Sequence, residues 1–393
     1  MGDLTEKEIR YDEIKLKNKL LVEGINVDPL IFKHLDLGRT VKEQVNIMFA
    51  NDHHGHSGVD FPACILTEHG YRIAFRWEKE SPFTLLYKDG RFQIADGNHP
   101  VIDYVIFEGR PKYYDYQTTD GADMKTVAID YGYKSIFIAY SNECSLKEKG
   151  KDCLFCNINE TKNLYAECQK INWKTAKQIG ETVAAAYKEG KSQLTVSGGF
   201  IPERREADYY IDVAEEIKEY TGLEDFNGTA TIGAPVDFSV YDKYKEAGYR
   251  TVATNLEIWD SNIFKAICPG KEEYCGGRDN WLRAVRYARG VFGQFKVRST
   301  FVSGIEPKNS LLEGIEQLVS DGIIAIPNQW NVNVGSALEG HRTPRAEWHL
   351  DMAEKVVAIY RKHGLTWDLL ADATASQDTV IHDLFRLENG ITL

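Results

Sequence analysis

The feature that most constrains the fold is a repeated alternation of short apolar runs and amphipathic segments between residues 134 and 364. Each apolar run has the length of a buried strand, and each following segment has apolar residues at helical spacing. Six such strand–helix units in succession require parallel strands joined by helical crossovers. The predicted strands are KSIFIAY (134–140), QLTVSGGF (193–200), FNGTATIGA (226–234), RTVATNLEIW (250–259), KVRSTFVSGIE (296–306) and IIAIPNQW (323–330).

A parallel sheet of this kind curls into a barrel whose chemistry lies on the loops after the strand ends. We therefore predict an α/β fold, a partial (β/α)6 or full TIM-like barrel with an N-terminal α+β extension. The early part of the chain differs in pattern, with a charged helical opening over Leu4–Lys19 and then short alternating runs separated by DG, DGN and GRP turns. The predicted domains are residues 1–125, the extension, and residues 126–393, the barrel with a C-terminal extension.

The charge balance and the lack of long apolar runs exclude several classes of protein. With a net charge of −12 the chain lacks the basic character of a general nucleic-acid binder. No window approaches the run of about 18 apolar residues that a membrane helix needs. The charged N-terminus, MGDLTEKEIR, has no apolar core like that of a secretory signal. We expect a cytoplasmic protein without nucleic-acid or membrane partners.

Three of the seven cysteines lie close together directly after the first predicted strand, at Cys144, Cys153 and Cys156. An odd number of cysteines in a chain with cytosolic features disfavours a disulfide framework. Three soft thiolates on one loop suit an iron–sulfur cluster, and three ligands for four irons leave one iron open. A structural zinc site is the alternative, but it requires a fourth ligand, and Cys168 lies twelve residues further on.

This cysteine loop resembles that of the radical S-adenosylmethionine (radical SAM) superfamily. The usual spacing there is CxxxCxxC after the first barrel strand, with an aromatic residue, here Phe155, before the last cysteine. This chain departs from it in having eight residues between the first two cysteines. The resemblance implies a [4Fe–4S] cluster on Cys144, Cys153 and Cys156, with S-adenosylmethionine bound at the open iron.

Later strand ends also resemble elements that contact S-adenosylmethionine, especially in the biotin-synthase-like branch. The glycine pair after the second strand resembles a GGE-like turn, although Phe200 stands where the acidic residue is expected. The fourth strand resembles an element that holds the ribose, and the fifth and sixth resemble segments beside the methionine carboxylate, ribose and adenine. Each residue also has an ordinary alternative as a turn, a polar pair or an ion pair. The predicted cofactor-binding residues are Ser197, Gly198, Gly199, Asn255, Glu257, Arg298, Ser299 and Asn328.

The resemblance implies a reaction in which S-adenosylmethionine is reductively cleaved at the cluster, giving a 5′-deoxyadenosyl radical. This radical removes hydrogen from a small-molecule substrate, followed by rearrangement, insertion, methylation or a C–C bond change. An anaerobic reaction with a flavodoxin or ferredoxin-type electron donor is implied, and residues 1–125 are expected to help cover the site. The alternatives are a glycyl-radical-enzyme activase acting on a protein partner, and a non-catalytic structural zinc or iron–sulfur protein.

Several polar or sulfur-containing residues stay open to two interpretations. Four further cysteines are either small buried residues or ligands of an auxiliary cluster. A histidine-rich run is either a polar loop or a metal site, and polar residues after the sixth strand are either turn residues or substrate contacts. These residues are Cys64, Cys168, Cys268 and Cys275; His53, His54 and His56; and Asn331, Asn333, His341 and Arg342.

Overall fold

The computed structural model describes residues 5–36, 64–141, 143–158, 173–333 and 335–392. Its main element is a curved sheet with the strand order β14-β13-β12-β11-β10-β9-β8. The strands from β9 to β14 pair in parallel, and β8 (Ile129–Asp130) adds an antiparallel edge. The parallel strands are β9 (Ser135–Ala139), β10 (Gln193–Ser197), β11 (Gly228–Thr231), β12 (Thr251–Ala253), β13 (Val297–Ser303) and β14 (Ile324–Gln329).

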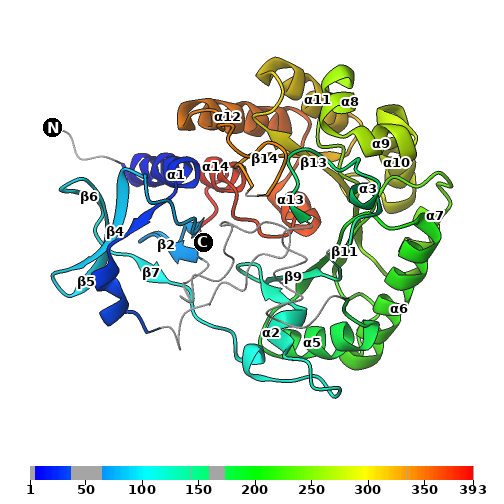
Figure 1. Ribbon diagram of the computed structural model, residues 1–393, viewed down its shortest axis with the longest axis horizontal. Coiled ribbons are helices and arrows are strands. Elements are labelled where there is room, and N and C mark those ends of the chain that lie inside the picture. Colours follow the sequence, from blue (N-terminus) through cyan, green and yellow to red (C-terminus); the bar gives the residue numbers. More distant parts are fainter. Residues whose placement is uncertain (1–4, 37–63, 142, 159–172, 334, 393) are drawn as a thin grey trace.

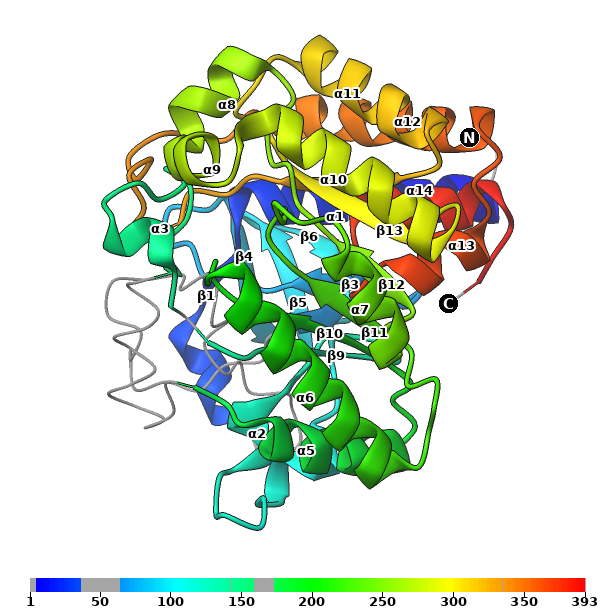
Figure 2. The same cartoon turned by 90° about the vertical axis from the view of Figure 1, so that its right-hand side faces the viewer.

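Helices follow these strands in chain order and cover the outer face of the sheet (Figure 2). The sheet does not close into a complete ring among the described residues, so the fold is the partial (β/α)6 barrel of the prediction. The barrel helices include α5 (Ala176–Lys188), α6 (Glu203–Thr221), α7 (Val240–Ala247), α10 (Gly277–Phe292), α11 (Lys308–Ser320) and α12 (Ala346–Lys362). The other described helices of this part are α2 (Met124–Val127), α3 (Ser145–Glu148), α8 (Ser261–Ile267), α9 (Pro269–Tyr274), α13 (Trp367–Ala373) and α14 (Val380–Glu388).

The N-terminal part is the predicted α+β extension. It begins with α1 (Glu6–Glu23), whose Thr5 and Glu8 form a capping box. One small sheet has the order β1-β4-β5-β6 and a second has the order β3-β2-β7, and buried residues such as Ile65, Leu85 and Ile94 give it a core of its own. Its remaining elements are β1 (Asn26–Val27), η1 (Pro29–Lys33), β2 (Cys64–Leu66), β3 (Arg72–Ala74), β4 (Phe83–Lys88), β5 (Arg91–Asp96), β6 (His99–Ile102), β7 (Ile106–Phe107) and η2 (Lys112–Asp115).

The extension is attached to the barrel by the two ends of the chain. Helix α1 lies beside α14 and α12 (Figure 1), and its Ile14 belongs to the barrel core. Between these helices, fully buried Lys17 forms an ion pair of 2.6 Å with Asp383. Helices α12 and α14 therefore connect the extension to the barrel. In the described parts of the chain, none of the helices is long and apolar enough to cross a membrane.

Candidate active site

A cavity of about 730 Å³ lies inside the curved sheet and reaches the loops after the strand ends. This volume is within the range of about 300–1,000 Å³ typical of small-molecule and cofactor sites. Its walls come from the barrel strands, the cysteine loop, the segment before α14 and residues 74–78 of the N-terminal extension. Ser299 is the one predicted site residue that does not line this cavity; the three cysteines and the other seven predicted residues do.

The cysteine loop follows β9 and is held from several sides by backbone hydrogen bonds. Cys144 immediately precedes α3, a single helical turn that accounts for part of the long gap before Cys153. Between Cys153 and Cys156, the Leu154 N–H donates to the Ile267 carbonyl (2.9 Å), and the Leu154 carbonyl accepts from the Leu338 N–H (3.1 Å). Segments that follow the fourth and sixth parallel strands thus position the loop of the first.

The three thiols act on one another electrostatically. Burial, together with the nearby Cys153 and Cys144, raises the pKa of Cys156 to about 12. A hydrogen bond from Cys268 lowers the pKa of Cys153, while burial raises that of Cys268. Cys275 is also close enough to respond to Cys153 and Cys144, although burial is the main reason that its pKa rises to about 11. Within the described residues, no three His, Cys, Asp or Glu side chains are arranged around a single-ion site.

The predicted glycine pair packs tightly against the cysteine loop. A Cβ atom on Gly199 would lie 2.0 Å from the carbonyl oxygen of Glu143 and 3.0 Å from the Cβ of Cys144. A Cβ on Gly198 would lie 2.5 Å from the Tyr140 ring. The lack of side chains at these two positions lets β10 and the cysteine loop approach each other. The buried Glu206 of α6 lines the same cavity and is an acidic group that the sequence pattern did not identify.

Asn255 and Glu257, both predicted to bind the cofactor, line the cavity and are held by a lysine. Lys271, from α9, donates a hydrogen bond of 2.8 Å to the Asn255 carbonyl and one of 3.1 Å to Oε1 of Glu257. Its ammonium also lies 4.2 Å from the centre of the Trp281 ring. Burial alone would lower the pKa of Lys271, but Glu257 and Cys153 raise it, so it stays charged. Glu257 has a φ of 73°, a left-handed backbone that this carboxylate adopts despite its side chain.

The sixth strand contributes polar atoms that have no partner in the protein. Asn328 lines the cavity as predicted, as do the next polar residues, Gln329 and Asn331. The Nε2 of Gln329 and the Oδ1 of Asn331 are buried and have no hydrogen-bond partner among the described residues. Unsatisfied buried polar atoms are costly, so this wall fits a polar ligand. The Asn333 side chain, by contrast, donates a hydrogen bond of 2.9 Å to the Phe155 carbonyl.

The two predicted residues of the fifth strand face opposite ways. Arg298 lines the cavity, whereas Ser299 is fully buried behind it and its Oγ accepts from the Leu256 N–H (2.9 Å). Adjacent strand residues alternate in direction. The predicted contact of Ser299 with S-adenosylmethionine is thus without support from its position.

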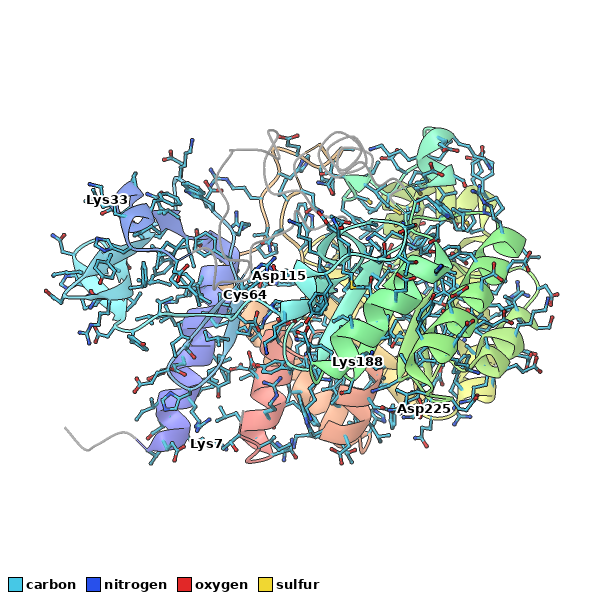
Figure 3. All side chains as sticks on the ribbon, turned by 90° about the horizontal axis from the view of Figure 1, so that it is seen from below. Lys7, Lys33, Cys64, Asp115, Lys188 and Asp225 are labelled. Atoms are coloured by element: carbon cyan, nitrogen blue, oxygen red, sulfur yellow. The ribbon has the colours of Figure 1, made fainter. Side chains whose placement is uncertain are left out.

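The residues left open by the sequence lie in different places. Cys268 and Cys275 are beside the cysteine loop. Cys64 is on β2 of the extension (Figure 3), and its thiol is close enough to Arg72 to interact with it electrostatically. His341 and Arg342 are exposed and do not line the cavity. Cys168 and the histidine run at 53–56 lie outside the described residues.

The fold and the site together define a partial (β/α) barrel with a three-cysteine loop at the mouth of a cofactor-sized cavity. The family model described as "Radical SAM superfamily" matches residues 138–309. This segment runs from β9 into α11 and includes the three cysteines. The chain therefore contains a radical SAM domain, and the domains of this superfamily use a [4Fe–4S] cluster and S-adenosylmethionine.

Two curated proteins are similar over part of their length. The bacteriochlorophyllide c C-7(1)-hydroxylase of Chlorobaculum limnaeum is 28% identical over 270 residues, 64% of this chain and 66% of that protein. The 5-amino-6-(D-ribitylamino)uracil–L-tyrosine 4-hydroxyphenyl transferase of Methanopyrus kandleri is 26% identical over 172 residues, 38% of this chain and 45% of that protein. The chain thus spans just under two thirds and just under half of these relatives. The solved structure of methylornithine synthase is 18% identical, covers 71% of this chain and 79% of that chain, and has a TM-score of 0.45.

Proposed function

We propose that this protein is a radical SAM enzyme that abstracts hydrogen from a small-molecule substrate inside the barrel. The observation that carries the proposal is the meeting of Cys144, Cys153 and Cys156 with the predicted strand-end residues around one cavity. A closed structural metal site does not need such a cavity beside it. When bound, the cluster and S-adenosylmethionine supply a 5′-deoxyadenosyl radical as the hydrogen-abstracting group.

The side chains around the cysteines have chemically distinct tasks in this proposal. The ammonium of Lys271 neutralises Glu257 and holds its carboxylate in place to accept from ribose hydroxyls. Glu206 takes the part of the acidic residue missing after Gly199 and accepts from the methionine amino group. Gln329 and Asn331 use their unsatisfied atoms on the adenine edge. None of these groups has to move a proton for the radical chemistry; they bind and orient.

Residues 74–78 of the extension, with Asn18 and Leu21 of α1, would complete the cover of the cavity. A cover is useful here because reactive intermediates must be shielded from water and from competing reductants. The electron is proposed to come from a flavodoxin or ferredoxin-type donor. The biotin-synthase-like branch and the division of the chain near residue 125 stay predictions.

Anaerobic reconstitution with iron and sulfide, followed by electron paramagnetic resonance of the reduced protein, tests the proposal. We expect a [4Fe–4S]⁺ signal that changes when S-adenosylmethionine is added, together with release of 5′-deoxyadenosine. The Cys144/Cys153/Cys156→Ala variant should lose the signal, and Cys64→Ala, which alters a buried cysteine of the extension, should keep it. A signal indifferent to S-adenosylmethionine would favour a structural cluster, and a stable complex with a large partner enzyme would favour an activase.

A further inference from the structure

The wall of the cavity contains a buried arginine without a carboxylate partner. Arg298 is 8% exposed, and its guanidinium donates a hydrogen bond of 3.0 Å to the carbonyl of Ala373. Among the described residues, no Asp or Glu forms an ion pair with it. Burial lowers its pKa to about 10, which still leaves it charged at neutral pH.

The other buried cations of this region are paired. Lys17 lies 2.6 Å from Asp383, and Arg72 lies 2.6 Å from Asp378 and 3.0 Å from Glu108. Asp383 also pairs with buried Arg386 at 3.0 Å, so these cations together with Arg298 are four against three carboxylates, and Arg298 is the surplus positive charge. An uncompensated buried charge is strongly unfavourable, so its presence in a cavity wall indicates that an anion from outside the protein occupies the space.

Two further groups next to Arg298 suit an anion. Tyr131 lines the cavity and is close enough to Arg298 for the two side chains to interact electrostatically. The start of α14, from Thr379 to His382, also lines the cavity, and a helix N-terminus favours negative charge. His382 adds no charge. Its Nε2 is hydrogen-bonded to the Thr374 hydroxyl and its Nδ1 to the Thr379 hydroxyl, and burial lowers its pKa to about 3.

Arg298 lies deeper in the barrel than the proposed cofactor wall. It precedes Phe301 by three residues on β13, and Phe301 pairs with Glu257. At about 3.3 Å per residue this places Arg298 roughly 10 Å along the strand from the Glu257 level. The distance leaves room for a small molecule between them.

We infer that Arg298 and Tyr131 bind the carboxylate of an apolar substrate that lies deeper in the barrel than S-adenosylmethionine. This inference rests on the proposed function, because the substrate must lie next to the cofactor. The walls of the cavity also include apolar side chains, among them those of Phe137, Ile326 and Met352. A single surplus charge matches a carboxylate, whereas a phosphate dianion would keep one unneutralised negative charge in a buried site.

The test uses the reconstituted protein with S-adenosylmethionine and three probes: 3-phenylpropanoate, its neutral amide and phenyl phosphate. Ligand-observed NMR should detect the carboxylate, with the amide bound at least tenfold more weakly, as expected for a charge-assisted hydrogen-bond pair. Arg298→Met should lose carboxylate binding by a similar factor. The matched control is Arg250→Met, at a partly exposed arginine paired with Asp225 and Asp372, which should bind the probe like the wild type.

Thermal unfolding without ligand supplies a second measurement. Because Arg298 is a buried charge without a counter-ion, Arg298→Met should melt at the wild-type temperature or above it. A clearly lower melting temperature would mean that Arg298 is structural and would overturn the inference. Equal binding of the amide, or tighter binding of the phosphate, would overturn the carboxylate assignment.

The spectroscopic response to S-adenosylmethionine separates this inference from the proposed function. If Arg298→Met loses that response together with probe binding, Arg298 belongs to the cofactor site and the inference fails while the function stands. If the wild type itself forms no cluster that responds to S-adenosylmethionine, the proposed function fails, whatever the probes do.

Discussion

Gly199→Ala tests whether close packing between β10 and the cysteine loop positions the cluster ligands. The new methyl carbon would lie 2.0 Å from the Glu143 carbonyl oxygen and 2.7 Å from its carbon. Normal C···O contacts are about 3.3 Å or longer, so one of the two backbones must move by roughly 1.3 Å. Overpacking of this kind costs about 1–3 kcal/mol. Cys144, whose Cβ is 3.0 Å from the same methyl, is the ligand that must move.

The assay combines iron content after anaerobic reconstitution with thermal unfolding of the protein before reconstitution. We expect Gly199→Ala to bind less iron and to melt several degrees lower than the wild type. The control is Gly290→Ala on the exposed face of α10, where an added Cβ meets no atom within 4 Å; this change should be neutral or slightly stabilising. A Gly199→Ala protein with wild-type iron content and stability would refute the argument that this contact positions Cys144.

Three further predictions follow from buried groups near the site. Cys268→Ala removes a hydrogen bond to Cys153 and should make the cluster potential more negative in a redox titration, whereas Cys268→Ser should restore it. Arg72→Met leaves Asp378 and Glu108 without their partner and should lower the free energy of unfolding by about 3–5 kcal/mol in urea titrations; a smaller loss than Arg250→Met would contradict this. Burial lowers the pKa of His349 to about 4, so its stabilising contribution is present above its unfolded pKa near 6.5 and is lost on acidification. Between pH 6.5 and 5, the free energy of unfolding of the wild type should therefore fall by about 2 kcal/mol more than that of His349→Gln. If the unfolding free energies of the two proteins change in parallel with pH, protonation of His349 is not the cause.

The order of the parallel strands could be predicted because each strand is a short apolar run, and each is followed by a segment with apolar residues at helical spacing. The same pattern predicted which strand ends meet, since the carboxyl ends of parallel strands share one edge of the sheet. The opposite directions of Arg298 and Ser299 were also available from the sequence, because neighbouring strand residues alternate. Alternation lets only one of these two residues face the cavity, and that residue is Arg298.

Other parts of the site depend on contacts between residues far apart in the chain. Lys271 is on α9 and comes to lie against Glu257 only when α8 and α9 fold back over β12. Helices α13 and α14 were not predicted, although threonine N-caps at Thr366 and Thr379 mark their starts. Nothing in the local pattern of residues 74–78 indicates that they line the cavity.

The ends of the chain explain how the cavity is both closed and charged. The ion pair between Lys17 of α1 and Asp383 of α14 joins the first and last helices, and Arg72 of the extension neutralises Asp378 at the start of α14. Asp378 lines the same cavity as Arg298, and without these contacts its carboxylate would be an unneutralised negative charge there. By engaging Asp378 elsewhere, the extension leaves the positive charge of Arg298 free. In the proposed enzyme the same extension that covers the cavity would therefore also give it its preference for an anionic substrate.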